Sequence, residues 1–405
     1  MEIELLWVFL FLALSIGWLL GFYTKPSNKI DEESYQAPQE IKHRLQLLFD
    51  SYSDESIDRF VHSLEVTPET LGTHISIGKH FRSQGEVEKA ILIHQNLMAH
   101  PELPDLASES IIYELAKDYK KAGLLDRAES LLRQLTTSKL FGFKSLILLL
   151  DVYEHEKDWE NAVSKGLELE LKKHPDVALR VAQYYCEIAE DKQYKGQFLE
   201  IRRCFKQALN IHKECIRALI GLARLDIEHK EFAFALNSLK QVAVLSPENI
   251  TLTLPMLLEC TVATNSFERQ QAYLEKMYKD TGQVPIMLAI VESLLTQGET
   301  TRAYQYLEGQ IHLNPSLSAL DMMFKKCGCD DLNSEQVDQA LNPSEKNLCE
   351  NMLGVVSKVI DDVVADKPSY RCNQCGFSGG QHHWMCPSCK GWQTTQPLVE
   401  YDNTL

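Results

Sequence analysis

Four cysteines near the end of the chain have the spacing of a metal site. Cys372 and Cys375 form one C-x-x-C pair, and Cys386 and Cys389 form a second pair ten residues later. Each C-x-x-C turn directs two thiolates at one point, so two such turns can enclose a metal ion tetrahedrally. The sequence therefore predicts one metal ion held by these four sulfurs. The spacing does not distinguish iron from zinc, because both accept four thiolates in this geometry.

Other readings of the same cysteines fit the sequence less well. Two redox disulfides are an alternative. Gly376 directly follows Cys375 and Pro387 directly follows Cys386, and both residues favour a metal knuckle over a redox disulfide. His382 and His383 are alternative ligands, although four cysteines already satisfy the ion. A site closed by four sulfurs has no position for a substrate, so we expect a structural or redox-sensing role. Four aromatic residues could form the core of so small a module: Tyr370, Phe377, Trp384 and Trp392.

The remainder of the sequence contains no recognisable catalytic motif. The 13 histidines are scattered, and no H-E-x-x-H, G-x-S-x-G or phosphate-binding glycine loop occurs. We therefore expect no enzymatic activity. A net charge of -16 without a basic run also argues against nucleic acid as a partner. Several cysteines stand alone in helix-like segments, which is typical of buried thiols in a reducing compartment: Cys186, Cys204, Cys215, Cys260 and Cys349.

A recurring pattern across the middle of the chain predicts helical repeats. Gly78, Phe81, Gly85 and Ala90 are separated by three, four and five residues. The same offsets recur from four later positions, namely Ala116, Leu150, Ala223 and Val291. The period is 34 residues, that of the tetratricopeptide repeat, in which a turn joins two helices packed through small residues. We therefore expect an all-α tetratricopeptide-repeat solenoid over residues 41–345, with a lengthened helix pair between residues 162 and 235. Such solenoids bind peptides or proteins on their concave face.

The N-terminal residues 1–24 have the character of a membrane anchor. Leu5–Tyr23 contains 19 residues without a charge, which as a helix would span about 28 Å, close to a bilayer core. A cleaved signal peptide would be preceded by basic residues, whereas Glu2 and Glu4 stand here. We therefore expect a single transmembrane helix.

Flanking residues predict the orientation of this helix. Lys25 and Lys29 follow it, and basic flanks stay on the cytoplasmic side. The repeats and the metal domain are therefore expected in the cytoplasm. Gly17 and Gly21 have the G-x-x-x-G spacing that lets two membrane helices approach, which would allow a homodimer.

Three further segments complete the predicted domain organisation. Residues 25–40 are expected to be a tether, residues 346–366 an amphipathic helix that caps the solenoid, and residues 367–405 the metal-binding domain. The linker between that helix and the first metal-binding turn is too short for free swinging. We therefore expect the metal domain to dock on the solenoid, with Trp384 and Trp392 as contacts. An independent tail is the alternative.

This combination resembles the lipopolysaccharide assembly protein B family of Gram-negative bacteria. The resemblance rests on the order of anchor, repeats and metal domain and on residues 370–392 in particular, which are similar to that family's rubredoxin-like domain. Lys390 stands where plain rubredoxins have glycine. The resemblance implies an inner-membrane adaptor that promotes degradation of LpxC by the FtsH protease and helps to gather synthesis enzymes at the membrane. It also implies a lipopolysaccharide-sensing membrane protein as a partner, and iron as the metal.

Two further functions compete with the adaptor. A membrane-tethered redox or metal-sensing carrier would use the cysteine site, but it would not need about 300 residues of protein-binding repeats. A passive scaffold for envelope enzymes is the other, and the sequence does not separate it from the adaptor.

Overall fold

The structure is a computed structural model that describes residues 66–67, 70–100, 105–193, 196–313, 316–323, 358 and 368–398. The predicted anchor and tether, Gly17 and Gly21, Cys349 and nearly all of the predicted capping helix lie outside these residues. The boundaries predicted at residues 40, 345 and 366 lie outside them as well. Within the described ranges, no helix is both long and apolar enough to cross a membrane.

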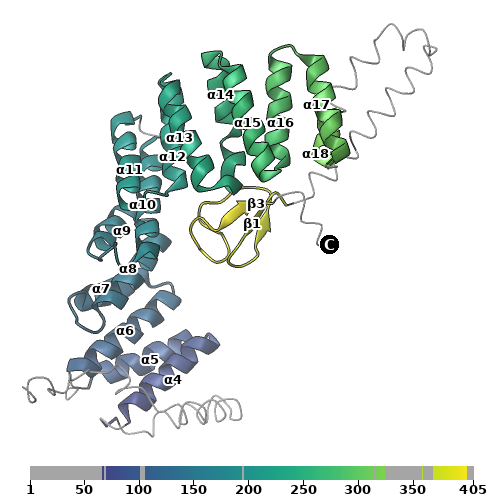
Figure 1. The fold of residues 1–405 in the computed structure, drawn as a ribbon. Coiled ribbons are helices and arrows are strands. Elements are labelled where there is room, and N and C mark those ends of the chain that lie inside the picture. Colours follow the sequence, from purple (N-terminus) through teal and green to yellow (C-terminus); the bar gives the residue numbers. More distant parts are fainter. Residues whose placement is uncertain are drawn as a thin grey trace, which may run out of the picture. The chain divides into compact units, whose positions relative to one another are not determined.

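The described helices follow one another in pairs (Figure 1). The contacts along the chain divide it into two units. The first unit, Met1–Asp158, contains α4 (Leu71–Gln84), α5 (Val87–Met98), α6 (Asp105–Lys121), α7 (Leu125–Leu135) and α8 (Gly142–Glu156). The second unit, Trp159–Leu405, begins with α9 (Trp159–Leu167), α10 (Pro175–Gln193), α11 (Phe198–Ile211), α12 (Ile216–Glu228) and α13 (Phe232–Leu245). It continues with the 3-10 helix η2 (Pro247–Leu252), α14 (Leu254–Thr264), α15 (Phe267–Thr281), α16 (Val284–Thr296), α17 (Thr300–Leu313) and α18 (Leu317–Met322).

A left-handed residue separates the two helices of every described pair. Glycine adopts this conformation without strain, and asparagine or lysine can adopt it at moderate cost. The seven residues have φ between 49° and 90°: Gly85, Gly123, Lys157, Gly196, Lys230, Asn265 and Gly298. Five of them occupy the turn position of the recurring pattern, so the predicted turns are confirmed.

Small residues lie at the closest approach of the second helices, as the pattern predicts. The alanine five residues after each predicted turn is fully buried in all five repeats: Ala90, Ala128, Ala162, Ala235 and Ala303. A larger side chain there would hold the helices apart. The lengthened pair is also confirmed, because α10 has 19 residues and is the longest helix among the described residues.

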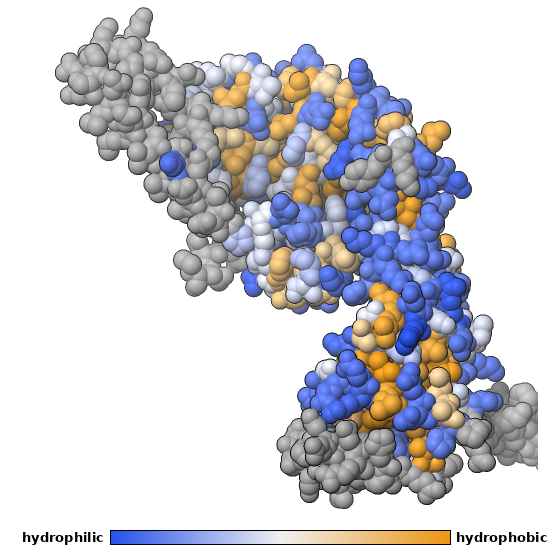
Figure 2. Space-filling view, turned by 180° about the vertical axis from the view of Figure 1, so that it is seen from behind, coloured by the Kyte–Doolittle hydropathy of each residue, from blue (hydrophilic) through white to orange (hydrophobic). Residues whose placement is uncertain are grey.

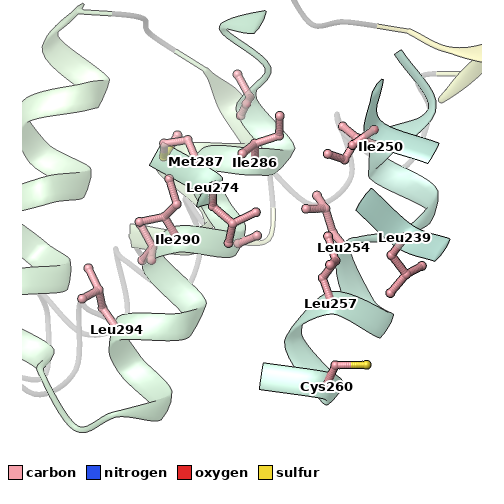
Figure 3. Packing of buried hydrophobic residues seen from close by; sticks show 14 of the residues in the cluster. Leu239, Ile250, Leu254, Leu257, Cys260, Leu274, Ile286, Met287, Ile290 and Leu294 are labelled. Carbon is pink, nitrogen blue, oxygen red and sulfur yellow. The ribbon is translucent and has the colours of Figure 1, made fainter. Parts of the chain in front are cut away.

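The largest described core cluster lies between α12 and α18 in the second unit. Figure 3 shows how α14 contributes Leu254, Leu257 and Cys260, while α16 contributes residues at four-residue spacing such as Ile286 and Ile290. Residues three or four apart share one face of a helix, so each helix buries one stripe against its neighbours. On the face that Figure 2 shows, hydrophilic residues cover much of the surface, and hydrophobic areas lie among them.

The C-terminal residues form a small sheet that carries the metal-binding turns. Its order is β2 (Ser378–Gly379), β1 (Tyr370–Cys372) and β3 (Thr395–Pro397), and both pairings are antiparallel. Tyr370 pairs with Gly379 on one side and Pro397 on the other. We call residues 368–398 the metal module. The pairing of β1 with β3 joins the beginning of the module to its end, and the four cysteines lie between the start of β1 and β3 in the sequence.

Candidate metal centre

Two matching turns hold the four cysteines. In the first turn, the N–H of Cys372 donates to the carbonyl of Phe377 at 2.7 Å, and the N–H of Gly376 donates to that of Cys372 at 2.9 Å. The second turn has the same two bonds. The N–H of Cys386 donates to the carbonyl of Gly391, and the N–H of Lys390 donates to the carbonyl of Cys386, at 2.9 Å each. Gly376 and Lys390 are both left-handed, with φ of 77° and 61°. Lys390 therefore adopts the conformation that glycine usually supplies, and the knuckle geometry is retained.

The turns bring all four predicted ligands to one point. The four Sγ atoms lie within 4.8 Å of one another. Cys372 and Cys389 have sulfurs 3.7 Å apart, and so do Cys375 and Cys386. Metal–sulfur bonds of about 2.3 Å in a tetrahedron place the sulfurs about 3.8 Å apart, so the donor set fits one metal ion. Iron and zinc both suit four thiolates, and the choice between them stays open.

Hydrogen bonds at the sulfurs prepare the site for a cation. The sulfur of Cys372 lies 3.3 Å from the hydroxyl of Thr394. Burial raises the pKa of the Cys372 thiol, but the hydrogen bond with Thr394 and those with backbone N–H groups outweigh burial and lower that pKa to about 6. Cys372 and Cys386 are buried, whereas Cys375 is exposed, so one side of the site borders the solvent.

The two histidines of the module serve its packing. His382 lies edge-on to Tyr370, with ring centroids 5.5 Å apart, and to Trp384 at 4.5 Å. His383 lies against Phe377 at 6.4 Å. The described cluster of ligand atoms contains only the four cysteines. Burial lowers the pKa of His382 to about 4, so its ring is neutral at pH 7.

The metal module packs on the helices of the second unit through Trp392. This ring is 7% exposed and lies edge-on to Trp159 and Tyr184, with centroids 6.3 and 6.2 Å away. Trp159 and Tyr184 stack on each other at 5.9 Å. The three rings join α9, α10 and the module in one buried aromatic cluster, an arrangement that adds to simple area burial. Trp392, which the sequence predicted both for the module's core and for docking, therefore contributes to the contact with the helices.

Trp384 makes the second contact. Its ring packs against a cluster on α12 and α13 that includes Ile216, Ile220 and Val242. The guanidinium carbon of Arg217 lies 5.8 Å from the ring centroid, which is a cation–π distance. Arg217 is only 4% exposed. Docking of the module with Trp384 and Trp392 as contacts is thus confirmed.

Acidic residues of α10 hold Arg217 in place beneath the module. Its guanidinium lies 2.7 Å from a carboxylate oxygen of Glu187 and 2.8 Å from one of Glu190. A buried cation needs such partners, because removing it from water is costly otherwise. The array therefore presents a fixed positive group to the tryptophan face.

Two side-chain amides complete the contact. Gln183 on α10 is fully buried and donates to the side-chain oxygen of Gln393 at 2.6 Å. Gln396 donates to Glu248 of η2 at 3.4 Å. Gln393 is left-handed, with φ of 52°, and its N–H donates to the carbonyl of Trp384 at 2.7 Å.

The sequence identified the module's half of this contact and missed the other half. In the sequence, the partners of the module resemble ordinary repeat residues, because their contacts form only when the chain has folded: Trp159, Tyr184, Gln183 and Arg217. One signal was present in α10 and α12: the polar residues Gln183 and Arg217 lie at buried positions, which packing alone does not require.

Comparisons with known proteins agree with the sequence. Residues 370–397 match the family described as rubredoxin metal binding domain. The chain is 27% identical to lipopolysaccharide assembly protein B of Escherichia coli (strain K12) over 400 residues, 99% of each chain. It is 25% identical to the protein of that name from Haemophilus influenzae, covering 99% of this chain and 100% of that one. The resemblance inferred from the sequence is thereby confirmed.

Solved structures are more distant. The crystal structure of the MamA protein covers 45% of this chain and 95% of its own, with 14% identity and a TM-score of 0.33. A tetratricopeptide repeat protein from Parabacteroides merdae covers 70% and 99%, with 13% identity and a TM-score of 0.33.

Proposed function

We propose that this protein is a non-catalytic adaptor in lipopolysaccharide assembly at the inner membrane. The observation that carries the proposal is its similarity to lipopolysaccharide assembly protein B along 99% of both chains. That span includes the apolar N-terminal segment, the helical pairs and the metal module. A match to the metal module alone would have supported only a metal-binding domain.

The chemistry of the described residues supports a role without catalysis. Four protein sulfurs would fill the coordination sphere of a tetrahedral metal ion, which would leave no position for a substrate or an activated water. The four cysteines are also the only described group of side chains suited to a metal ion. A closed site is suited to holding structure, and the metal would supply folding energy to the module when bound.

In its finer form, the proposal follows the resemblance. The protein would promote degradation of LpxC by the FtsH protease, respond to a lipopolysaccharide-sensing membrane protein, and gather synthesis enzymes. Helical pairs offer the extended surfaces that such contacts need. An anchor in residues 1–24 would confine the adaptor and a membrane protease to two dimensions and so raise their effective concentration.

The metal module is proposed to act as part of the helical array. Trp392, Arg217 and Gln183 tie it to α10 and α12. A partner that contacts these helices next to the module would therefore sense whether the module is folded. Iron is the metal that the resemblance implies, and zinc fits the same sulfurs.

Turnover of LpxC tests the proposal. Deleting the gene should lengthen the half-life of LpxC, and the full-length chain should restore rapid turnover. A chain without residues 1–24 should remain folded and fail to restore it, because the local concentration is lost. Unchanged LpxC turnover in the deletion strain would contradict the adaptor.

A further inference from the structure

A pair of thiols lies beneath the docked metal module, apart from the four metal-binding cysteines. Cys186 on α10 and Cys215, the residue before α12, have sulfurs 3.9 Å apart. Both side chains are fully buried. The sequence predicted buried single thiols here, and burial is confirmed, but the fold brings two of them into contact across neighbouring helical pairs.

One side chain links this thiol pair to the metal module. The amide nitrogen of Gln183 lies 3.6 Å from the sulfur of Cys215 and donates to Gln393 of the module at 2.6 Å. The oxygen of the same amide lies 3.5 Å from Arg217, the residue beneath Trp384. The next residue, Tyr184, packs against Trp392. Gln183 therefore contacts both the module and Cys215, so removal of the module would expose the side chain next to Cys215.

The two sulfurs have different chemical surroundings. The hydrogen bond with Cys186 and those with backbone N–H groups at the start of α12 lower the pKa of the Cys215 thiol, although burial opposes them. Burial raises the pKa of Cys186 well above its ordinary value. Cys215 is thus suited to be the attacking thiolate, and Cys186 to be the thiol that resolves the product.

We propose that Cys186 and Cys215 are a redox-responsive thiol pair that a peroxide converts to a disulfide when the metal module leaves its docking site. The Cys215 thiolate attacks one peroxide oxygen, which forms an S–OH group, breaks the O–O bond and releases hydroxide. Cys186 then attacks the sulfur of that group, which forms the S–S bond and releases a second hydroxide. The two thiol protons end in two waters, the two sulfurs lose two electrons in total, and the peroxide gains them.

The docked module acts as the cover of this pair. Buried thiols react slowly because the oxidant does not reach them. In a reducing compartment, a disulfide of this kind is transient and reports oxidation rather than stabilising the fold. The bridge would draw the sulfurs to about 2.05 Å and join α10 to α12, the helices that carry the docking site.

Differential trapping of thiols tests this inference in the full-length, metal-loaded protein. Wild type and a Trp392→Ala variant are treated with hydrogen peroxide, free thiols are alkylated, and linked peptides are identified by mass spectrometry. Undocking should raise the rate at which the Cys186–Cys215 disulfide forms on the order of tenfold, because the reaction rate follows the fraction of molecules in which the module is undocked. Cys260, a buried thiol in α14, is the internal control and should stay reduced.

Two further samples keep the test decisive. Cys215→Ser in the Trp392→Ala background should leave Cys186 as a free thiol. Wild type stripped of metal by a chelator provides a second undocked state, and peptide mapping separates this disulfide from any that the four ligand cysteines form. Equal rates in docked and undocked protein would overturn the proposal, as would the absence of the Cys186–Cys215 peptide in both undocked samples.

Discussion

Helices α12 and α13 contact each other through residues that are close in the sequence. The metal module belongs to the same unit, but it contacts helices that are far from it in the sequence. The two helices follow one another through the turn at Lys230, and Ala223 and Ala235 are fully buried in the core that they share. The module reaches back instead, and its Gln393 bonds to Gln183, 210 positions earlier. The helical pair is thus a local structure, whereas the module depends on a distant surface.

This difference implies an order of dependence. Each repeat is stabilised by contacts with its neighbours, so we expect the array of pairs to fold without the module. The module has few apolar residues, and one of its tryptophans packs on α9 and α10. We therefore expect the module to need a metal ion for its own fold and the helical array for its position.

Removing the metal ligands should have the largest effect. A Cys372→Ser, Cys386→Ser double variant should lose its metal and unfold the module, since metal binding supplies on the order of 10 kcal/mol to so small a fold. Elemental analysis would show less than one metal ion per chain. Cys260→Ser is the matched control and should keep the metal. A double variant that retains the metal would mean that the ligands are assigned wrongly.

Removing the docking tryptophan should separate placement from folding. Trp392→Ala should keep its metal but weaken docking on the order of 2 kcal/mol, as a central aromatic contact does. Limited proteolysis would then release an intact C-terminal fragment by cleavage between residues 365 and 372. Phe234→Ala, which removes an aromatic ring that is 66% exposed on α13, should not release it. Equal resistance of wild type and Trp392→Ala would contradict the docking role of this ring.

The first unit has a buried ionic network that should show itself in the effect of pH. Burial alone would raise the pKa of Glu114, but Lys79, Lys117 and Arg82 lower it to about 2. A depressed pKa in the folded state stabilises the fold above the unfolded pKa near 4.5, and that contribution is lost as pH falls from 4.5 to 2. Glu114→Gln should therefore destabilise α4 to α6 by about 3 kcal/mol at pH 7.

Hydrogen exchange of amides in α4 to α6 measures this effect. The difference between wild type and Glu114→Gln should shrink as pH falls from 4.5 toward 2. Lys120→Ala breaks a more exposed ion pair, with Asp151, and should change little. A difference that is independent of pH would assign the loss to packing instead of charge.

The turns between paired helices should give the smallest effect. Gly85 has φ of 90° and open space around it, so Gly85→Ala should destabilise its pair by about 1 kcal/mol through backbone strain. Lys157 is already left-handed, so Lys157→Gly should change stability by less than about 0.5 kcal/mol, because relief of strain and added unfolded-state freedom offset each other. Urea unfolding would compare the two. Equal losses would show that these turns do not share one conformation.

The sequence predicted what depends on short-range spacing. The offsets after Gly78 located paired helices, their turns and their buried alanines, because a repeat is encoded within 34 residues. The two C-x-x-C turns likewise located the metal ligands. The sequence did not predict Arg217 and Gln183 as docking residues or the meeting of Cys186 with Cys215. Those contacts depend on which helices lie side by side and on long-range packing that no local pattern encodes.

We propose that the metal module regulates through its position on the helices, and LpxC half-life in cells tests this proposal most directly. A strain lacking the gene would carry wild type, Trp392→Ala or Phe234→Ala at equal protein levels. We predict that Trp392→Ala keeps its metal and still fails to restore rapid LpxC turnover, while Phe234→Ala restores it. Normal turnover with a Trp392→Ala module shown to be released by proteolysis would contradict the claim.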